Sequence, residues 1–233
     1  MSSGDLMGYM VNKKGRGLSD RQVRMVVKLN GALDEAVLAK AVRLAFDAEP
    51  VTGCRLVEKP LVPYWRRCAS LEGAFEFRRV NPSGEWAAIT DFLLAPLDPE
   101  AGPQVRVALL RSDCDNLCIK MSHIIADAGA SMDYIRVLSG IYRRLLNDPG
   151  YRPECNIRGS RSAFQVLRRA GIRKVISSIP HVAVPSPVRT LPAAGPGEKK
   201  PHIIFRRIDP ARASRIKSYA RVRGATVGDA LVA

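Results

Sequence analysis

The chain has 233 residues, of which 46% are hydrophobic, enough for one large domain or two small ones with a buried core. It contains no run of about 18 apolar residues that would span a membrane, and residues 1–5 lack the charged-then-apolar pattern of a secretion signal. The net charge is +15, and the five cysteines are scattered and odd in number, so we expect reduced thiols in a cytoplasmic protein rather than a disulfide framework.

The first hundred residues alternate between strand and helix patterns. Residues 1–20 are polar and glycine-rich, as in a loop, and residues 21–30 have an apolar strand pattern. Asp34 predicts the start of a helix over about residues 34–47, because its carboxylate can accept hydrogen bonds from free backbone amides. The next expected elements are strands at 52–58 and 74–80 and a helix from Trp86 to Leu94.

The next fifty residues predict a hairpin followed by a long helix. Residues 104–111 and 116–122 are strand-like and flank a turn around Asp113–Asp115. Residues 128–147 have helical periodicity, and Asn147–Gly150 ends the pattern. We expect the inward side of this helix to consist of Met132, Ile135, Leu138, Tyr142 and Leu145.

The last third of the chain is less regular. A short helix is expected near residues 161–170, after which six prolines favour an extended crossover or linker over 178–201. Residues 202–208 predict a strand, 210–223 a basic helix, and Thr226 the cap of one more helix. These patterns divide the chain into an N-terminal lobe, 1–177, the Pro-rich linker, 178–201, and the beginning of a second lobe, 202–233.

Residues 121–131, Met-Ser-His-Ile-Ile-Ala-Asp-Ala-Gly-Ala-Ser, follow a strand pattern and open the long helix. His123 would end the strand, with Asp127 in the turn. Imidazole changes protonation near neutral pH, so a histidine placed in this way suits a general base. A nearby carboxylate can orient the ring or hold the turn. The alternatives are a half-buried histidine satisfied by a carbonyl group and an aspartate that only caps the helix.

This stretch resembles the His-His-x-x-x-Asp-Gly motif of a superfamily of CoA- and carrier-protein-dependent acyltransferases. The superfamily includes condensation domains of nonribosomal peptide synthetases and chloramphenicol acetyltransferase. In the family the second His is the catalytic base and the Asp is mainly structural; these positions match His123 and Asp127. The first His is Ser122 here, and the motif Gly is Ala128, with Gly129 next.

Two further segments support the resemblance. Residues 21–56 are similar to the opening strand-helix unit of condensation domains, and residues 205–231 are similar to the crossing into the second half of the family. The resemblance thus covers the N-terminal half of the family. It implies an α/β (α+β) fold, a two-layer mixed β-sheet with packed helices that forms a chloramphenicol-acetyltransferase-like half-domain.

The resemblance also implies a reaction. An acyl group would pass from an acyl-CoA or phosphopantetheine thioester on a carrier protein to an alcohol or amine, with His123 as base and without a metal or a covalently bound cofactor. In the family the Asp pairs with an arginine whose position matches Gly53 here, and Arg55 is a nearby substitute. Because Ser122, Ala128 and Gly53 depart from the motif, the alternative is an inactive binding or scaffold module of the same fold.

The positive charge is concentrated late in the chain. Residues 151–223 contain 17 Lys and Arg against three acidic residues, whereas residues 1–150 contain 20 against 18. Such a block attracts polyanions, and we expect its Arg168, Arg169, Arg173 and Lys174 to bind the acyl donor, as CoA or an acidic carrier domain. A nucleic-acid binder is a weaker alternative because aromatic residues for base stacking are few. An anionic membrane surface and a merely solvated face are the other interpretations.

The resembled family places its active site between two similar halves. We therefore expect full acyl transfer only when a second lobe follows Ala233. The isolated chain should either self-associate through the apolar wall that this lobe would cover or leave that wall open.

Overall fold

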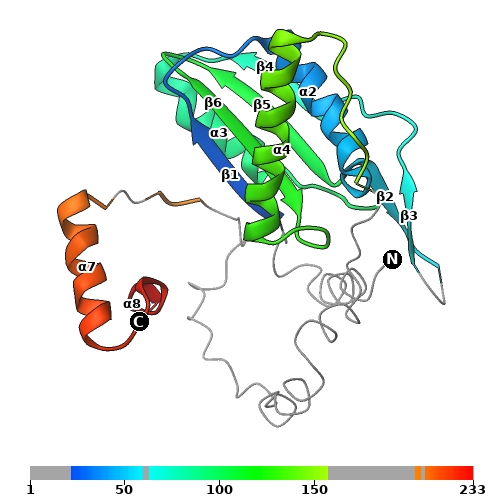
Figure 1. The fold of residues 1–233 in the computed structure, drawn as a ribbon. Helices are drawn as coiled ribbons and strands as arrows, with labels where there is room; N and C mark the ends of the chain where they lie inside the picture. The colour runs from blue at the N-terminus through cyan, green and yellow to red at the C-terminus, as the bar shows by residue number, and fades with distance from the viewer. Residues whose placement is uncertain (1–21, 60–62, 157–202, 206–207, 233) are drawn as a thin grey trace, which may run out of the picture. The chain divides into compact units, whose positions relative to one another are not determined.

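The computed structural model describes residues 22–59, 63–156, 203–205 and 208–232. The chain forms two compact units, Met1–Pro196 and Gly197–Ala233. The first contains the described β-strands and the His123 turn, and the described residues of the second form helices α7 and α8 (Figure 1). The predicted N-terminal loop, the helix at 161–170 and the linker at 178–201 lie outside the described residues.

The first unit is built on a four-stranded mixed sheet with the strand order β1-β6-β5-β4. β1 (Gln22–Lys28) and β5 (Val105–Arg111) pair antiparallel with β6 (Asp115–Ser122), and β4 (Phe75–Arg79) pairs parallel with β5. The structure confirms these four predicted strands and the hairpin between β5 and β6. Because β6 has a neighbour on each side, all of its residues are buried, and its end is a rigid place from which to present a side chain.

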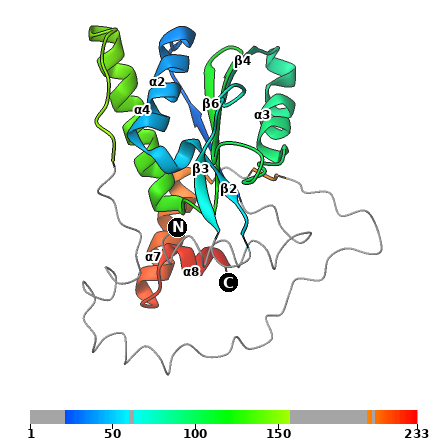
Figure 2. The ribbon, with the colours of Figure 1, turned by 90° about the vertical axis from the view of Figure 1, so that its right-hand side faces the viewer.

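Helices cover both faces of this sheet. α2 (Glu35–Ala48) and α4 (Ala128–Asn147) pack together on one face, and α3 (Glu85–Leu94) covers the other (Figure 2). The core between the sheet and the α2–α4 pair is formed by large apolar side chains that include Leu38, Phe46, Leu109, Ile119 and Leu138. A mixed sheet with packed helices is therefore confirmed, and α3 adds a layer on the second face.

The α4 helix has the predicted bounds but a different buried face. Its buried residues are Ser131, Tyr134, Leu138, Ile141 and Leu145. Met132, which was predicted to face inward, is 51% exposed. The predicted and observed stripes both follow helical spacing and differ by one residue at several positions. Periodicity alone could not separate them, because apolar residues occur on both sides, and packing against α2 and the sheet selected the face that contains Tyr134 and Ile141.

A second, two-stranded antiparallel sheet consists of β2 (Cys54–Val57) and β3 (Tyr64–Arg67). The strand predicted over 52–58 begins only at Cys54, because Pro50–Gly53 form the 3-10 helix η1. Another 3-10 helix, η2 (Pro82–Gly84), precedes α3. The sequence did not predict β3, since four residues are too few for an alternating pattern.

Two cations of the sheet hold the C-terminal end of α3. Lys120 is 1% exposed, and its Nζ donates hydrogen bonds to the carbonyl groups of Phe92 (2.8 Å) and Ala95 (2.7 Å). Arg24, which lies opposite Lys120 in the β1–β6 register, donates from Nε to the Leu93 carbonyl (2.7 Å). The free carbonyl groups at a helix C-terminus carry partial negative charge, so the two cations stabilise α3 against the sheet.

The second unit contains α7 (Pro210–Val222) and α8 (Val227–Val232). Asp209 caps α7, and Thr226 caps α8 as predicted, with its Oγ1 accepting a hydrogen bond from the Asp229 N–H group (3.2 Å). The strand predicted over 202–208 is wrong for residues 203–205, which have no regular structure. A strand needs a hydrogen-bonding neighbour, and none of the described strands pairs with this segment. None of the described helices is long and apolar enough to cross a bilayer.

Candidate functional site

The predicted motif lies at the C-terminal end of β6, where the chain turns into α4 (Figure 1). His123 is the first residue after the strand, and its side chain is exposed, whereas its neighbours Ser122 and Ile124 are buried. No hydrogen bond links the His123 ring to another described residue. The predicted position at the junction of β6 and α4 is confirmed.

The backbone of the turn folds around Ser122. The Ser122 carbonyl group accepts hydrogen bonds from the amides of Ile125 (3.1 Å) and Ala126 (3.3 Å), and its Oγ accepts one from the Ile124 amide (3.4 Å). Ser122 stands where the resembled family has its first His. In this chain it contributes to the shape of the turn that carries His123.

Apolar packing also stabilises the turn, through the three residues that follow His123. Ile124 is buried against Leu56 of β2, with Trp65 of β3 beside them. Ile125 and Ala126 belong to the main core between the sheet and the α2–α4 pair. Three consecutive buried residues thus follow the exposed histidine, which limits how far the turn can move.

Asp127 is the N-cap of α4. Its Oδ1 accepts a hydrogen bond from the Ala130 amide (2.8 Å), and its carbonyl group accepts bonds from the Ser131 amide (2.9 Å) and hydroxyl (2.7 Å). Ala128 and Gly129 form the exposed first turn of the helix. A Cβ at Gly129 would lie 3.4 Å from Asp127 Oδ1, which is an ordinary contact distance. The structure therefore gives Asp127 a local role, that of a helix cap.

Among the described residues, no arginine forms an ion pair with Asp127. Arg55, the predicted substitute partner, lies in β2. Gly53, at the family's arginine position, is buried, and a Cβ there would lie 2.8 Å from Arg67 Nη1. Arg67 instead donates hydrogen bonds to the Phe46 carbonyl group (2.6 Å) and to Asp47 (2.7 Å). Arg67 was missed by sequence reasoning because β3, its strand, carries no recognisable pattern.

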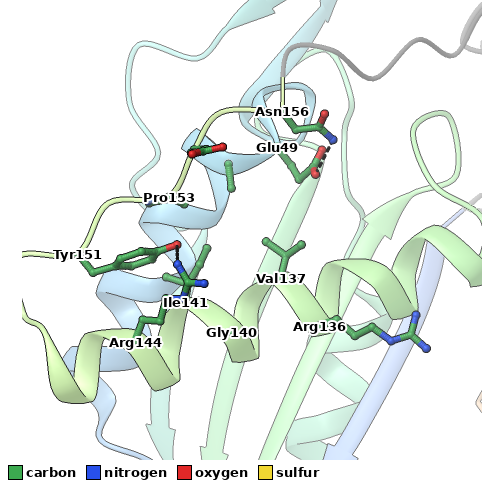
Figure 3. A pocket seen from close by; sticks show the side chains of 11 residues that line it. Glu49, Arg136, Val137, Gly140, Ile141, Arg144, Tyr151, Pro153 and Asn156 are labelled. Atoms are coloured by element: carbon green, nitrogen blue, oxygen red, sulfur yellow. Dashed lines mark hydrogen bonds between the residues drawn. The ribbon is translucent and has the colours of Figure 1, made fainter.

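A shallow groove of about 260 Å³ lies apart from this turn, between α4 and residues 151–156 (Figure 3). Val137 and Gly140 of α4 line it, and polar side chains border it. Four of these polar side chains bond in two pairs: Arg144 donates to the Tyr151 hydroxyl (3.1 Å), and Asn156 donates to Glu49 (2.9 Å). Neither His123 nor Asp127 lines the groove, so it does not extend the motif site.

The remaining predicted site residues, Arg168, Arg169, Arg173 and Lys174, lie outside the described residues. Within the described ranges, no group of three or more His, Cys, Asp or Glu side chains is arranged to hold a metal ion.

Neither a family model nor a curated protein matches the chain. Solved structures do match it. The first condensation domain of the calcium-dependent antibiotic synthetase, in complex with a substrate analogue, matches with a TM-score of 0.71 and 19% identity over 97% of this chain and 57% of that chain. The starter condensation domain of rhizomide synthetase matches with a TM-score of 0.58 and 16% identity over 80% of this chain and 48% of that chain.

The epimerization domain from the third module of tyrocidine synthetase B also matches, with a TM-score of 0.57 and 14% identity over 78% of this chain and 42% of that chain. The chain thus spans about half the length of these domains. At such low identity the likeness concerns the fold. The chain therefore has a condensation-domain-like fold, in which a mixed sheet with packed helices carries the His123 turn.

Proposed function

We propose that this chain is part of a condensation-type acyltransferase in which His123 is the general base. The observation that carries the proposal is the exposed His123 side chain, held on a buried turn at the end of β6 in a condensation-domain-like fold. The substrates would be an acyl thioester of CoA or of a carrier protein and an amine or alcohol. We further propose a cytoplasmic location, in line with the scattered, odd set of cysteines.

The proposed reaction uses the imidazole as a proton carrier. A ring nitrogen of His123 takes the proton from the amine or hydroxyl group as that atom forms a bond with the thioester carbonyl carbon. The tetrahedral intermediate then expels the thiolate, which recovers the proton from the imidazolium. Amide or ester and free thiol are released, and the imidazole returns to its neutral form. Such assistance contributes about 10²–10⁴-fold, and holding two substrates in register supplies more.

In this proposal Asp127 acts through the turn and not on the substrates. It caps α4 through the Ala130 amide and so fixes where the helix begins, five residues after the histidine. The carrier-bound donor would approach the exposed side of the turn. A second lobe would supply the facing wall, because the chain spans only about half of the domains it resembles.

The test compares wild type with His123→Ala in the full-length protein. The probes are an acyl N-acetylcysteamine thioester and a set of amines and alcohols, with product measured by mass spectrometry. We expect a loss in kcat of about 10²–10⁴-fold. The free energy of unfolding should stay within about 0.5 kcal/mol of wild type, because the side chain is exposed. Met132→Ala, an exposed change on α4, is the matched control and should keep full turnover. Equal turnover by wild type and His123→Ala would refute the assignment.

A scaffold without catalysis is the second candidate. The observation that favours it is the altered environment of the motif: Ser122 replaces a histidine, and Arg67 lies over Gly53 and bonds to α2 rather than to Asp127. This candidate predicts that a carrier domain binds the full-length protein while no thioester yields product, whether or not His123 is present.

A further inference from the structure

Gln104 is a buried polar side chain near the motif whose amide nitrogen contacts several carbonyl groups, while its Oε1 accepts no hydrogen bond from the described residues. It lies directly before β5 and is 0% exposed. Its Nε2 donates hydrogen bonds to three carbonyl groups, those of Pro99 (2.9 Å), Cys54 (3.1 Å) and Gly102 (3.2 Å). One side-chain amide therefore joins β2 to the loop that follows α3.

The backbone of Gln104 reaches two more segments. Its N–H group donates to the Thr52 carbonyl group (2.8 Å) in η1, and its carbonyl group accepts from the Ser122 amide (2.9 Å) at the end of β6. Gln104 thus connects η1, β2, the loop after α3 and the last residue of the strand that precedes His123. Removing one partner of a buried hydrogen bond costs free energy, so we expect these four segments to keep their positions relative to one another.

The two supports of the His123 turn both depend on these connections. The backbone amide of Ser122 donates to the Gln104 carbonyl group, and Ser122 in turn accepts the hydrogen bonds that fold the turn. Leu56, on the strand that Gln104 ties at Cys54, packs against Ile124. The hydrogen bonds of Ser122 and the apolar packing of Leu56 on Ile124 both support the histidine turn, and Gln104 is bonded to the segments that provide both.

We propose that Gln104 is the positioning residue of the site: it contacts no substrate, but it sets the place of the His123 imidazole through Ser122 and through β2. The inference rests on the proposed role of His123 as base. A displacement of about 1 Å at a reacting group can lower a rate by about 10²-fold, so a residue far from the chemistry can have a large effect.

The kinetic test uses Gln104→Met in the full-length protein, since Met has a similar length and no N–H donor. We expect kcat with an acyl N-acetylcysteamine thioester to fall about 10–100-fold while KM for both substrates stays within about two-fold. Gln22→Met is the matched control, because Gln22 is the register partner of Ser122 on the neighbouring strand β1. This control should keep wild-type kcat.

A double variant separates positioning from general damage. If Gln104 acts through His123, then adding Gln104→Met to His123→Ala should lower kcat no further than His123→Ala alone. A full additional 10–100-fold loss would overturn the proposal. If His123→Ala itself has no effect, the proposed base is wrong, a failure that is distinct from that of Gln104.

A measurement without turnover completes the test. In the full-length protein, with the signals assigned by His123→Ala, each of the two carbon-bound imidazole protons of His123 should give one sharp NMR signal in wild type and Gln22→Met. In Gln104→Met each proton should give a broadened signal or several signals. If Gln104→Met does not fold, hydrogen exchange of wild type decides the matter: the Ser122, Ile125 and Ala126 amides should be protected to nearly the level of β5 and β6. An unchanged imidazole signal in the folded variant, or rapid exchange at these amides, would contradict the proposal.

Discussion

The two ends of β6 show opposite treatments of ionisable side chains. At the N-terminal end, Asp115 is 1% exposed and accepts hydrogen bonds from Arg111 Nε (2.7 Å), Arg111 Nη2 (2.8 Å) and the Leu33 amide (2.7 Å). At the C-terminal end, His123 and Asp127 are exposed and form no ion pair with another described residue. We call the Asp115 end of β6, where the ion pair is buried, the closed end, and the His123 end, where the side chains are exposed, the open end.

The difference shows that the ionisable side chains at one end of β6 are used for stability, whereas those at the other end are exposed to solvent. The Arg111 guanidinium also donates to the Leu33 carbonyl group (2.6 Å). The hydrogen bonds among Arg111, Asp115 and Leu33 therefore join β5, β6 and the segment before α2. The His123 turn is held by backbone hydrogen bonds and by buried apolar neighbours, and among the described residues no side chain bonds to its imidazole. A group that must exchange protons with a substrate needs this freedom.

The largest expected effect is at the closed end. Asp115→Ala removes the acceptor of three hydrogen bonds and should lower the free energy of unfolding by about 1–3 kcal/mol. Urea denaturation followed by circular dichroism measures the change. The control is Asp133→Ala on α4, which breaks the exposed pair with Arg136 and should cost under about 0.5 kcal/mol. Equal effects of the two changes would show that the contrast between buried and exposed pairs is wrong.

Acid should weaken the closed end selectively. The hydrogen bond from Arg111 is the main reason that the pKa of Asp115 lies below its ordinary value, and the Leu33 amide adds to this effect against the opposing effect of burial. A lowered pKa contributes stability that is fully present above the unfolded-state value of about 3.9 and is lost as pH falls through the folded-state value. The stability difference between wild type and Asp115→Asn should stay constant above about pH 5 and shrink below about pH 4. A difference that grows on acidification would contradict this sign.

The smallest expected effect is at the open end. Asp127→Ala removes the cap of α4 and should cost about 1 kcal/mol, whereas Asp127→Asn should cost close to nothing, because Asn caps helices as well as Asp. Thermal or urea unfolding of the two variants measures this directly. If Asn were as damaging as Ala, the charge of Asp127 would matter as well as its cap, and the open end would contain an ion pair that the described residues do not show.

Local patterns predicted most of what surrounds the motif. The alternation of Leu117, Ile119 and Met121 predicted β6, and helical periodicity after Asp127 predicted α4, so the place of His123 at their junction followed from the sequence. Caps such as Asp34 were also predictable, because a cap needs only one side chain and the amide three residues later. The likeness to condensation domains came from this same motif and was confirmed for the fold.

Contacts between distant segments were not predictable in this way. The buried face of α4, the short strand β3, the position of Arg67 over Gly53 and the absence of a strand at 203–205 all depend on which neighbours are present. Gln104 is the clearest case, since its partners Cys54 and Ser122 are 50 and 18 positions away along the chain. The sequence alone determined the strand, the turn and the helix around His123, because those signals are local in the chain. Only the tertiary structure decided what holds that turn in place, because hydrogen bonds and packing between distant segments exist only once the chain has folded.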